Sequence, residues 1–69
     1  MHHTRSLLRL PDVQKLTGLS RSSVYRLEAT GDFPKRVHLS ERATAWREDE
    51  LLEWIDTRPR VNELTPSAA

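Results

Sequence analysis

Residues 17–27 read Thr17-Gly18-Leu19-Ser20-Arg21-Ser22-Ser23-Val24-Tyr25-Arg26-Leu27 and contain the boundary between two predicted helices. Glycine readily adopts the left-handed conformation that ends a helix, so Gly18 predicts a helix end. Ser20 can accept a hydrogen bond from a backbone N–H group at the start of the next helix and thereby cap it. A three-residue break between two short helices is typical of a helix-turn-helix.

The helix before this break is predicted to start at Pro11, because the first helical position does not need a backbone N–H group. Asp12 falls in the first turn, where a carboxylate interacts favourably with the helix dipole. Val13 and Leu16 are three residues apart, so they are predicted to share the buried face. Residues 6–9 are predicted to form a short extended segment that leads into this helix.

The helix after the break is predicted to run from Arg21 to about Thr30, where Gly31 supplies a second left-handed stop. Helical spacing places one set of side chains, Ser23, Val24 and Leu27, on the side that faces Leu19 and the core. The other side is predicted to be polar and cationic, and it carries Arg21, Ser22, Tyr25, Arg26 and Ala29.

Phe33 is expected to fold into the core, because so short a chain has few large apolar anchors. Residues 35–39 and 43–46 carry β-branched and aromatic residues on either side of Ser40-Glu41-Arg42, which predicts a small hairpin. A third helix is predicted from about Glu48 to Thr57, before Pro59. Its predicted apolar stripe consists of Leu51, Leu52, Trp54 and Ile55.

The length of 69 residues supports one small domain. The elements predicted above make this domain mainly α-helical with a small β-hairpin. Residues 5–58 are predicted to form the domain, and residues 59–69 a flexible C-terminal tail with few apolar side chains. The lack of cysteine excludes disulfides and thiolate metal sites and is typical of proteins in a reducing compartment. No apolar run has the length of a membrane span or a signal peptide, so we expect a cytoplasmic location and no membrane partner.

The net charge of +1 hides a polarity along the chain. Residues 1–47 contain nine Lys or Arg and four Asp or Glu, which gives 9 − 4 = +5. Residues 48–69 contain two Lys or Arg and six Asp or Glu, which gives 2 − 6 = −4. Nine of the eleven cations are arginine, whose planar fork suits phosphates and guanine edges. This charge distribution supports an anionic partner for the N-terminal part of the chain.

Two helices around a glycine turn, a cationic second helix and a following hairpin together predict a winged helix-turn-helix that binds double-stranded DNA. Arginine in the major groove can bond guanine, while hydroxyls and backbone N–H groups at the helix start bind phosphates. The candidate DNA-binding residues are Ser20, Arg21, Ser22, Tyr25 and Arg26 on the helix and Lys35, Arg36, His38 and Arg42 around the hairpin. Glu28 lies on the same helix and would repel phosphates.

A series of motifs in this order resembles the AlpA family of short phage and prophage regulators. The motifs are Leu8-Arg9-Leu10-Pro11-Asp12-Val13, the segment 17–27 quoted above, Gly31-Asp32-Phe33-Pro34-Lys35, Ala45-Trp46-Arg47 and Trp54-Ile55. The resemblance covers roughly residues 7–57 and implies a winged helix domain related to MerR-type and excisionase-like proteins. It further implies DNA binding by the 20–27 helix and the hairpin, positive regulation of transcription, and core positions for Val24, Leu27, Phe33, Trp46 and Trp54.

Three functions fit these observations. The first is a sequence-specific transcription regulator that acts positively on phage or prophage genes, through contact with RNA polymerase by recruitment or antitermination. The second is an excisionase, a recombination directionality factor that bends DNA beside an integrase. The third is an adaptor whose cationic helix docks on an acidic protein.

Enzymatic and metal-dependent functions are not expected. His2, His3 and His38 are too scattered for a metal-ligand motif, and serines 20, 22 and 23 have no histidine nearby that could activate a nucleophile. We therefore predict no cofactor, no metal and no catalytic residue. The domain offers no spare apolar seam for a stable dimer, so we expect a monomer in solution and several copies on DNA.

Overall fold

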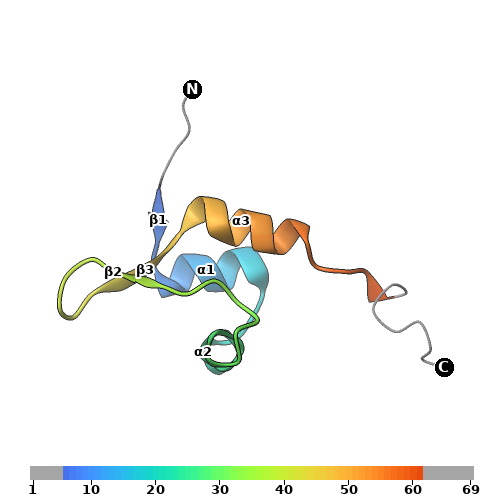
Figure 1. Cartoon of the computed structure of the whole chain (residues 1–69), viewed down its shortest axis with the longest axis horizontal. Coiled ribbons are helices and arrows are strands. Elements are labelled where there is room, and N and C mark those ends of the chain that lie inside the picture. Colours follow the sequence, from blue (N-terminus) through green and yellow to red (C-terminus); the bar gives the residue numbers. More distant parts are fainter. Residues whose placement is uncertain (1–5, 62–69) are drawn as a thin grey trace.

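The computed structural model describes residues 6–61 and contains three helices around a three-stranded antiparallel sheet in this part of the chain (Figure 1). The elements in chain order are β1 (Leu7–Leu8), α1 (Leu10–Thr17), α2 (Arg21–Ala29), β2 (Val37–His38), β3 (Thr44–Arg47) and α3 (Glu48–Asp56). This arrangement confirms the predicted fold class, a mainly α-helical winged helix-turn-helix. Position 5 of the predicted domain and positions 62–69 of the predicted tail lie outside the described residues.

The turn between α1 and α2 has the predicted geometry. Gly18 ends α1 with a φ of 74°, and its N–H group donates to the Gln14 carbonyl at 2.7 Å. Ser20 caps α2, because its hydroxyl accepts a hydrogen bond from the Ser23 N–H group at 3.2 Å. Gly31 follows α2 with a φ of 86°. Both left-handed positions are therefore occupied by the residue type that adopts them without steric cost.

The sheet has the order β1-β3-β2, with β3 as its central strand. β2 and β3 pair Val37 with Ala45 and His38 with Thr44, which confirms the predicted hairpin; its first strand is shorter than predicted, and its second strand lies one residue later. We call residues 37–47 the wing. The predicted extended segment supplies β1, which pairs with β3 through Leu7–Arg47 and Leu8–Trp46. This second pairing was not predicted, because a two-residue strand carries no alternation pattern.

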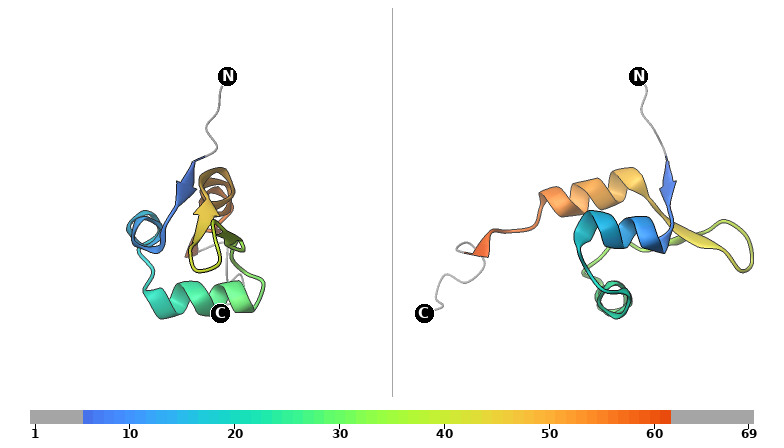
Figure 2. Two further views of the ribbon diagram at one scale, coloured as in Figure 1. Left: turned by 90° about the vertical axis from the view of Figure 1, so that its left-hand side faces the viewer. Right: turned by 180° about the vertical axis from the view of Figure 1, so that it is seen from behind.

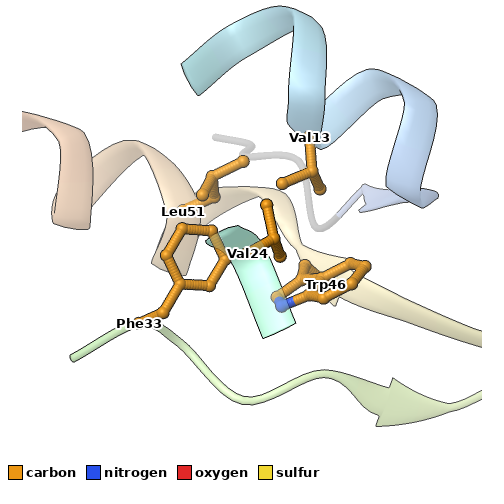
Figure 3. Packing of buried hydrophobic residues seen from close by; sticks show 5 residues of the cluster. All are labelled: Val13, Val24, Phe33, Trp46 and Leu51. Carbon is orange, nitrogen blue, oxygen red and sulfur yellow. The ribbon is translucent and has the colours of Figure 1, made fainter. Parts of the chain in front are cut away.

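The core lies where the three helices meet the central strand (Figure 3). It consists of Val13, Val24, Phe33, Trp46 and Leu51, which are each 5% exposed or less. Every helix, the crossing segment before β2 and the central strand contribute one of these side chains. Burying one such side chain contributes only about 1.5–3 kcal/mol, so the total stabilisation from this small core is modest.

Two residues that the sequence predicts to lie in the core are exposed instead, so these predictions are wrong. Leu16 is 46% exposed in α1, and Leu52 is 42% exposed in α3. Each of these helices is covered on one side only, so the buried stripe is narrower than the apolar stripe in the sequence. Trp54 is half-buried, and its indole N–H donates to the Asp32 carbonyl at 2.7 Å while its ring lies 4.7 Å from that of Phe33.

The start of α3 continues directly from β3. Arg47 is both the last residue of β3 and the N-cap of α3, and the Glu48 N–H group donates to the Ser6 carbonyl at 2.8 Å. Acidic residues occupy the first turn of α3, where they interact favourably with the helix dipole. α3 ends at Asp56, before the predicted limit at Thr57. Within residues 6–61, no helix is long and apolar enough to span a bilayer.

Candidate nucleic-acid interface

α2 lies at one side of the molecule, and the wing extends beside it (Figure 2). In Figure 1, α2 is viewed end-on below α1, and the hairpin of β2 and β3 extends laterally. Val24 anchors α2 to the core as a fully buried side chain. The opposite side of α2 is left exposed, so the fold presents a helix face and a hairpin on the same part of the surface.

The exposed face of α2 is cationic and rich in hydroxyls. Arg21, Ser22 and Arg26 are exposed, as predicted. The Ser20 hydroxyl lies 3.4 Å from that of Ser22 and 3.0 Å from that of Ser23, while the Arg26 guanidinium donates to the Ser23 hydroxyl at 3.4 Å. Hydroxyls, helix N-terminal N–H groups and guanidinium groups are all donors, so this end of α2 is suited to phosphate and base acceptors.

Tyr25 corrects the predicted outer face of α2. Its side chain is half-buried, and its ring centroid lies 6.3 Å from that of Trp46. The Arg36 guanidinium carbon lies 4.9 Å from the Tyr25 ring centroid and that of Arg21 lies 5.8 Å from it. Tyr25 therefore packs partly against the core and forms an aromatic base for two guanidinium groups.

Glu28 has a partner that the sequence did not suggest. Its carboxylate accepts a hydrogen bond from the Arg36 backbone N–H group at 2.8 Å, and its other oxygen is paired with the Arg36 guanidinium. The Glu28 side chain is only 12% exposed and that of Arg36 is 37% exposed. The expected repulsion between Glu28 and phosphates is therefore offset by a cation that lies directly against it.

The remaining predicted residues lie on the wing and on the segment that leads into it. Lys35, His38 and Arg42 are exposed, and Arg42 falls in the turn at the tip. A shallow hollow separates α2 from the wing, and Glu28, Lys35, Arg36, His38 and Thr44 line it. Three of the four hairpin candidates, Lys35, Arg36 and His38, therefore line this hollow on the side of the wing that faces α2. The fourth candidate, Arg42, does not line it.

Sequence reasoning missed Thr44 and the structural role of Glu28. Thr44 pairs with His38 across the hairpin, so an accurate hairpin register would have placed it beside that candidate. The Glu28–Arg36 pair joins residues on either side of the turn at Gly31, and no helical or strand periodicity relates two such positions. Of the three histidines considered as metal ligands, His2 and His3 lie outside the described residues.

Comparison with known proteins agrees with this arrangement. Residues 6–59 match the family model described as "Prophage CP4-57 regulatory protein (AlpA)". The chain is 37% identical over 63 residues to the "DNA-binding transcriptional activator AlpA" of Escherichia coli (strain K12), with 80% of this chain and 87% of that protein covered. It is 43% identical over 51 residues to the "Uncharacterized protein ORF88" of Enterobacteria phage P4, where the match covers 74% of this chain and 58% of that protein.

The family match extends from the residue before β1 to Pro59, so it includes the helix-turn-helix, the wing and α3. A match to more than half of the chain, together with a relative covered over most of its length, identifies the family. This chain belongs to the AlpA family of prophage regulatory proteins.

Proposed function

We propose that this chain is a sequence-specific DNA-binding protein that activates transcription of phage or prophage genes. The observation that carries the proposal is the exposed cationic face of α2 beside the wing, on a helix-turn-helix whose turn has the required glycine and serine. The relative in Escherichia coli is named as a DNA-binding transcriptional activator, which supports the same activity here.

The proposed binding mode places α2 in the major groove, where Arg21 and Arg26 contact base edges. A bidentate contact between arginine and guanine contributes about 1–3 kcal/mol of discrimination against other bases. The hydroxyls of Ser20 and Ser22 lie at the start of α2, where they can contact backbone phosphates. Tyr25 and Arg36 support the helix face, and Lys35, His38 and Arg42 contact a flanking phosphate track or minor groove from the wing.

Activation requires a contact with the transcription machinery in addition to DNA. α3 carries exposed carboxylates at Glu50, Glu53 and Asp56, and it is a different element from α2. A basic surface of RNA polymerase would be complementary to this face while α2 remains bound to DNA. We therefore include recruitment of RNA polymerase in the proposal.

The first experiment identifies the DNA site. The protein is used to select duplexes from a random pool, and a selected duplex and its scrambled version are then compared by titration. Tighter binding to the selected duplex is the expected result. Equal affinity for the two duplexes would contradict sequence-specific binding.

The second experiment assigns the function of the site. The selected sequence is mapped in the host genome, and the neighbouring promoter is fused to a reporter. A higher reporter signal with the protein than without it is expected, and Glu53→Gln combined with Asp56→Asn should reduce that signal without changing DNA affinity. Stimulated excision of a prophage with no change in the reporter would instead assign the protein to the excisionase class.

A further inference from the structure

The contact between Glu28 and Arg36 joins the two parts of the proposed DNA interface. Glu28 lies in the last turn of α2, and Arg36 immediately precedes β2, the first strand of the wing. The backbone between them passes through Gly31, which has a left-handed conformation. The middle of this connection is held to the core by Phe33 and by the Trp46 indole, which donates to the Pro34 carbonyl at 3.0 Å, and the Glu28–Arg36 contact links its far end directly to α2.

Three interactions converge on Arg36. Its backbone N–H group and its guanidinium both donate to the Glu28 carboxylate, one to each oxygen. Its guanidinium carbon also lies 4.9 Å from the centroid of the Tyr25 ring, which in turn packs near Trp46. Because the backbone of residue 36 is held as well as its side chain, the contact fixes the path of the chain into β2.

We propose that Glu28 is a positioning residue that sets the distance and angle between α2 and the wing for DNA recognition. The inference rests on the proposed DNA binding and adds to it a role for an acidic residue inside a cationic surface. Because Glu28 is paired with Arg36, it neutralises that cation, so DNA of every sequence binds less tightly than it would to an unpaired Arg36. The fixed wing increases the preference for the correct DNA sequence over others, because only duplexes of the right shape can contact α2 and the wing together.

Glu28→Gln tests the proposal. Glutamine keeps the size of the side chain and an acceptor for the Arg36 N–H group, but it loses the charge that holds the guanidinium. Affinity for the scrambled duplex should rise by about twofold, because one negative charge is removed from the interface. The ratio of selected to scrambled affinity should fall by about fivefold, the size expected when a charge-assisted hydrogen bond is weakened.

Two further variants separate charge from geometry. Glu53→Gln on α3 changes the net charge of the protein equally, and we expect it to leave the affinity ratio unchanged. Arg36→Lys keeps the net charge but loses the planar fork that both pairs with Glu28 and stacks on Tyr25. It should lower the affinity ratio without raising the affinity for the scrambled duplex.

A measurement without DNA decides whether Glu28 holds the wing at all. Heteronuclear 15N relaxation of residues 37–47 reports picosecond-to-nanosecond motion of the wing backbone. Glu28→Gln should make these residues more mobile than in the wild-type protein, whereas Glu53→Gln should not. Unchanged wing mobility in Glu28→Gln would overturn the proposal.

The DNA measurements give the other decisive outcomes. Equal loss of affinity for both duplexes in Glu28→Gln, with a lower melting temperature, would show a purely structural role and overturn the inference. Absence of any preference in the wild-type protein would instead refute the proposed sequence-specific function. In that case the relaxation comparison would still show whether Glu28 fixes the wing.

Discussion

Arg21 and Arg26 are the exposed cations of α2, and the proposed reading of base edges depends on them. Arg26 also donates to Ser23 on the preceding turn, which restricts its side chain before DNA is bound. A restricted side chain loses less conformational entropy when it forms a contact, so Arg26 is well suited to a defined base contact.

Replacing either arginine with alanine should weaken binding to the selected duplex by about 1–3 kcal/mol if its guanidinium makes a bidentate base contact. The measurement is a titration of selected and scrambled duplexes at one salt concentration. Lys15→Ala on α1 serves as the control, because it removes one exposed cation from another helix and should affect the two duplexes alike. Unchanged affinity of both arginine variants for the selected duplex would contradict this placement of the DNA surface.

Trp54 supports the fold from a half-buried position. Trp54→Ala should destabilise the domain by about 3 kcal/mol, the lower end of the range for removing a core aromatic, since part of the ring is exposed. The loss includes the hydrogen bond to the Asp32 carbonyl and the contact with Phe33. Thermal unfolding followed by circular dichroism measures the effect.

Leu52→Ala is the matched control for this variant, because Leu52 lies on the same helix and is 42% exposed. It should change stability by no more than about 0.5 kcal/mol, as is usual for surface substitutions. A larger loss for Leu52→Ala than for Trp54→Ala would show that the packing of α3 differs from that described above.

The start of α2 depends on one hydroxyl. Ser20→Ala should lower the free energy of unfolding by about 0.5–2 kcal/mol, because the Ser23 N–H group loses its acceptor. Ser22→Ala removes a neighbouring hydroxyl that does not cap the helix and should have a smaller effect. Chemical denaturation of the two variants gives the comparison, and equal losses would argue against the cap.

The helix boundaries could be predicted from the sequence because local chemistry sets them. Pro11, Gly18, Ser20 and Gly31 each act on the backbone next to them, and the structure confirms the helix ends that they predict within about a residue. The burial of Phe33 could also be predicted, since a domain of this size has few alternatives for its core.

The remaining features depend on contacts between distant parts of the chain. β1 is defined by its pairing with β3, and the ring of Tyr25 is half-buried because Trp46 from β3 lies against it. Leu16 and Leu52 have apolar side chains at helical spacing, yet within residues 6–61 they are 46% and 42% exposed. The exposure of the candidate cations Arg21, Arg26, Lys35 and Arg42 could be predicted from the sequence, whereas the pairing of Glu28 with Arg36 could not.

Two helices on different parts of the molecule, α2 and α3, carry opposite net charge. α2 carries exposed arginines, and α3 begins with three acidic residues. α3 uses Leu51 in the core and partly buries Trp54 and Ile55, so Leu52 is its one exposed large apolar side chain, which is too little surface for a stable dimer interface. A single DNA-binding module of this kind buries about 600–1,000 Å² of protein surface, so several copies are needed for strong selectivity.

We therefore predict a monomer in solution and several copies on adjacent half-sites of the DNA. Half-sites on one face of the duplex should be separated by about one helical turn. Sedimentation of the free protein together with footprinting on the selected site measures both properties. A tight dimer without DNA, or one short protected patch, would refute the prediction.

The direct junction between β3 and α3 limits where this chain can change in length during evolution. Arg47 belongs to the central strand and also occupies the N-cap position of α3, so an inserted residue there would rotate the helix and displace Leu51 from the core. The turn at residues 40–42 lies at the far end of the wing and contributes no side chain to the core. Insertions and deletions among homologues should therefore accumulate at the wing tip and be absent from the strand–helix junction, so that the reach of the wing can vary while the orientation of α3 stays constant.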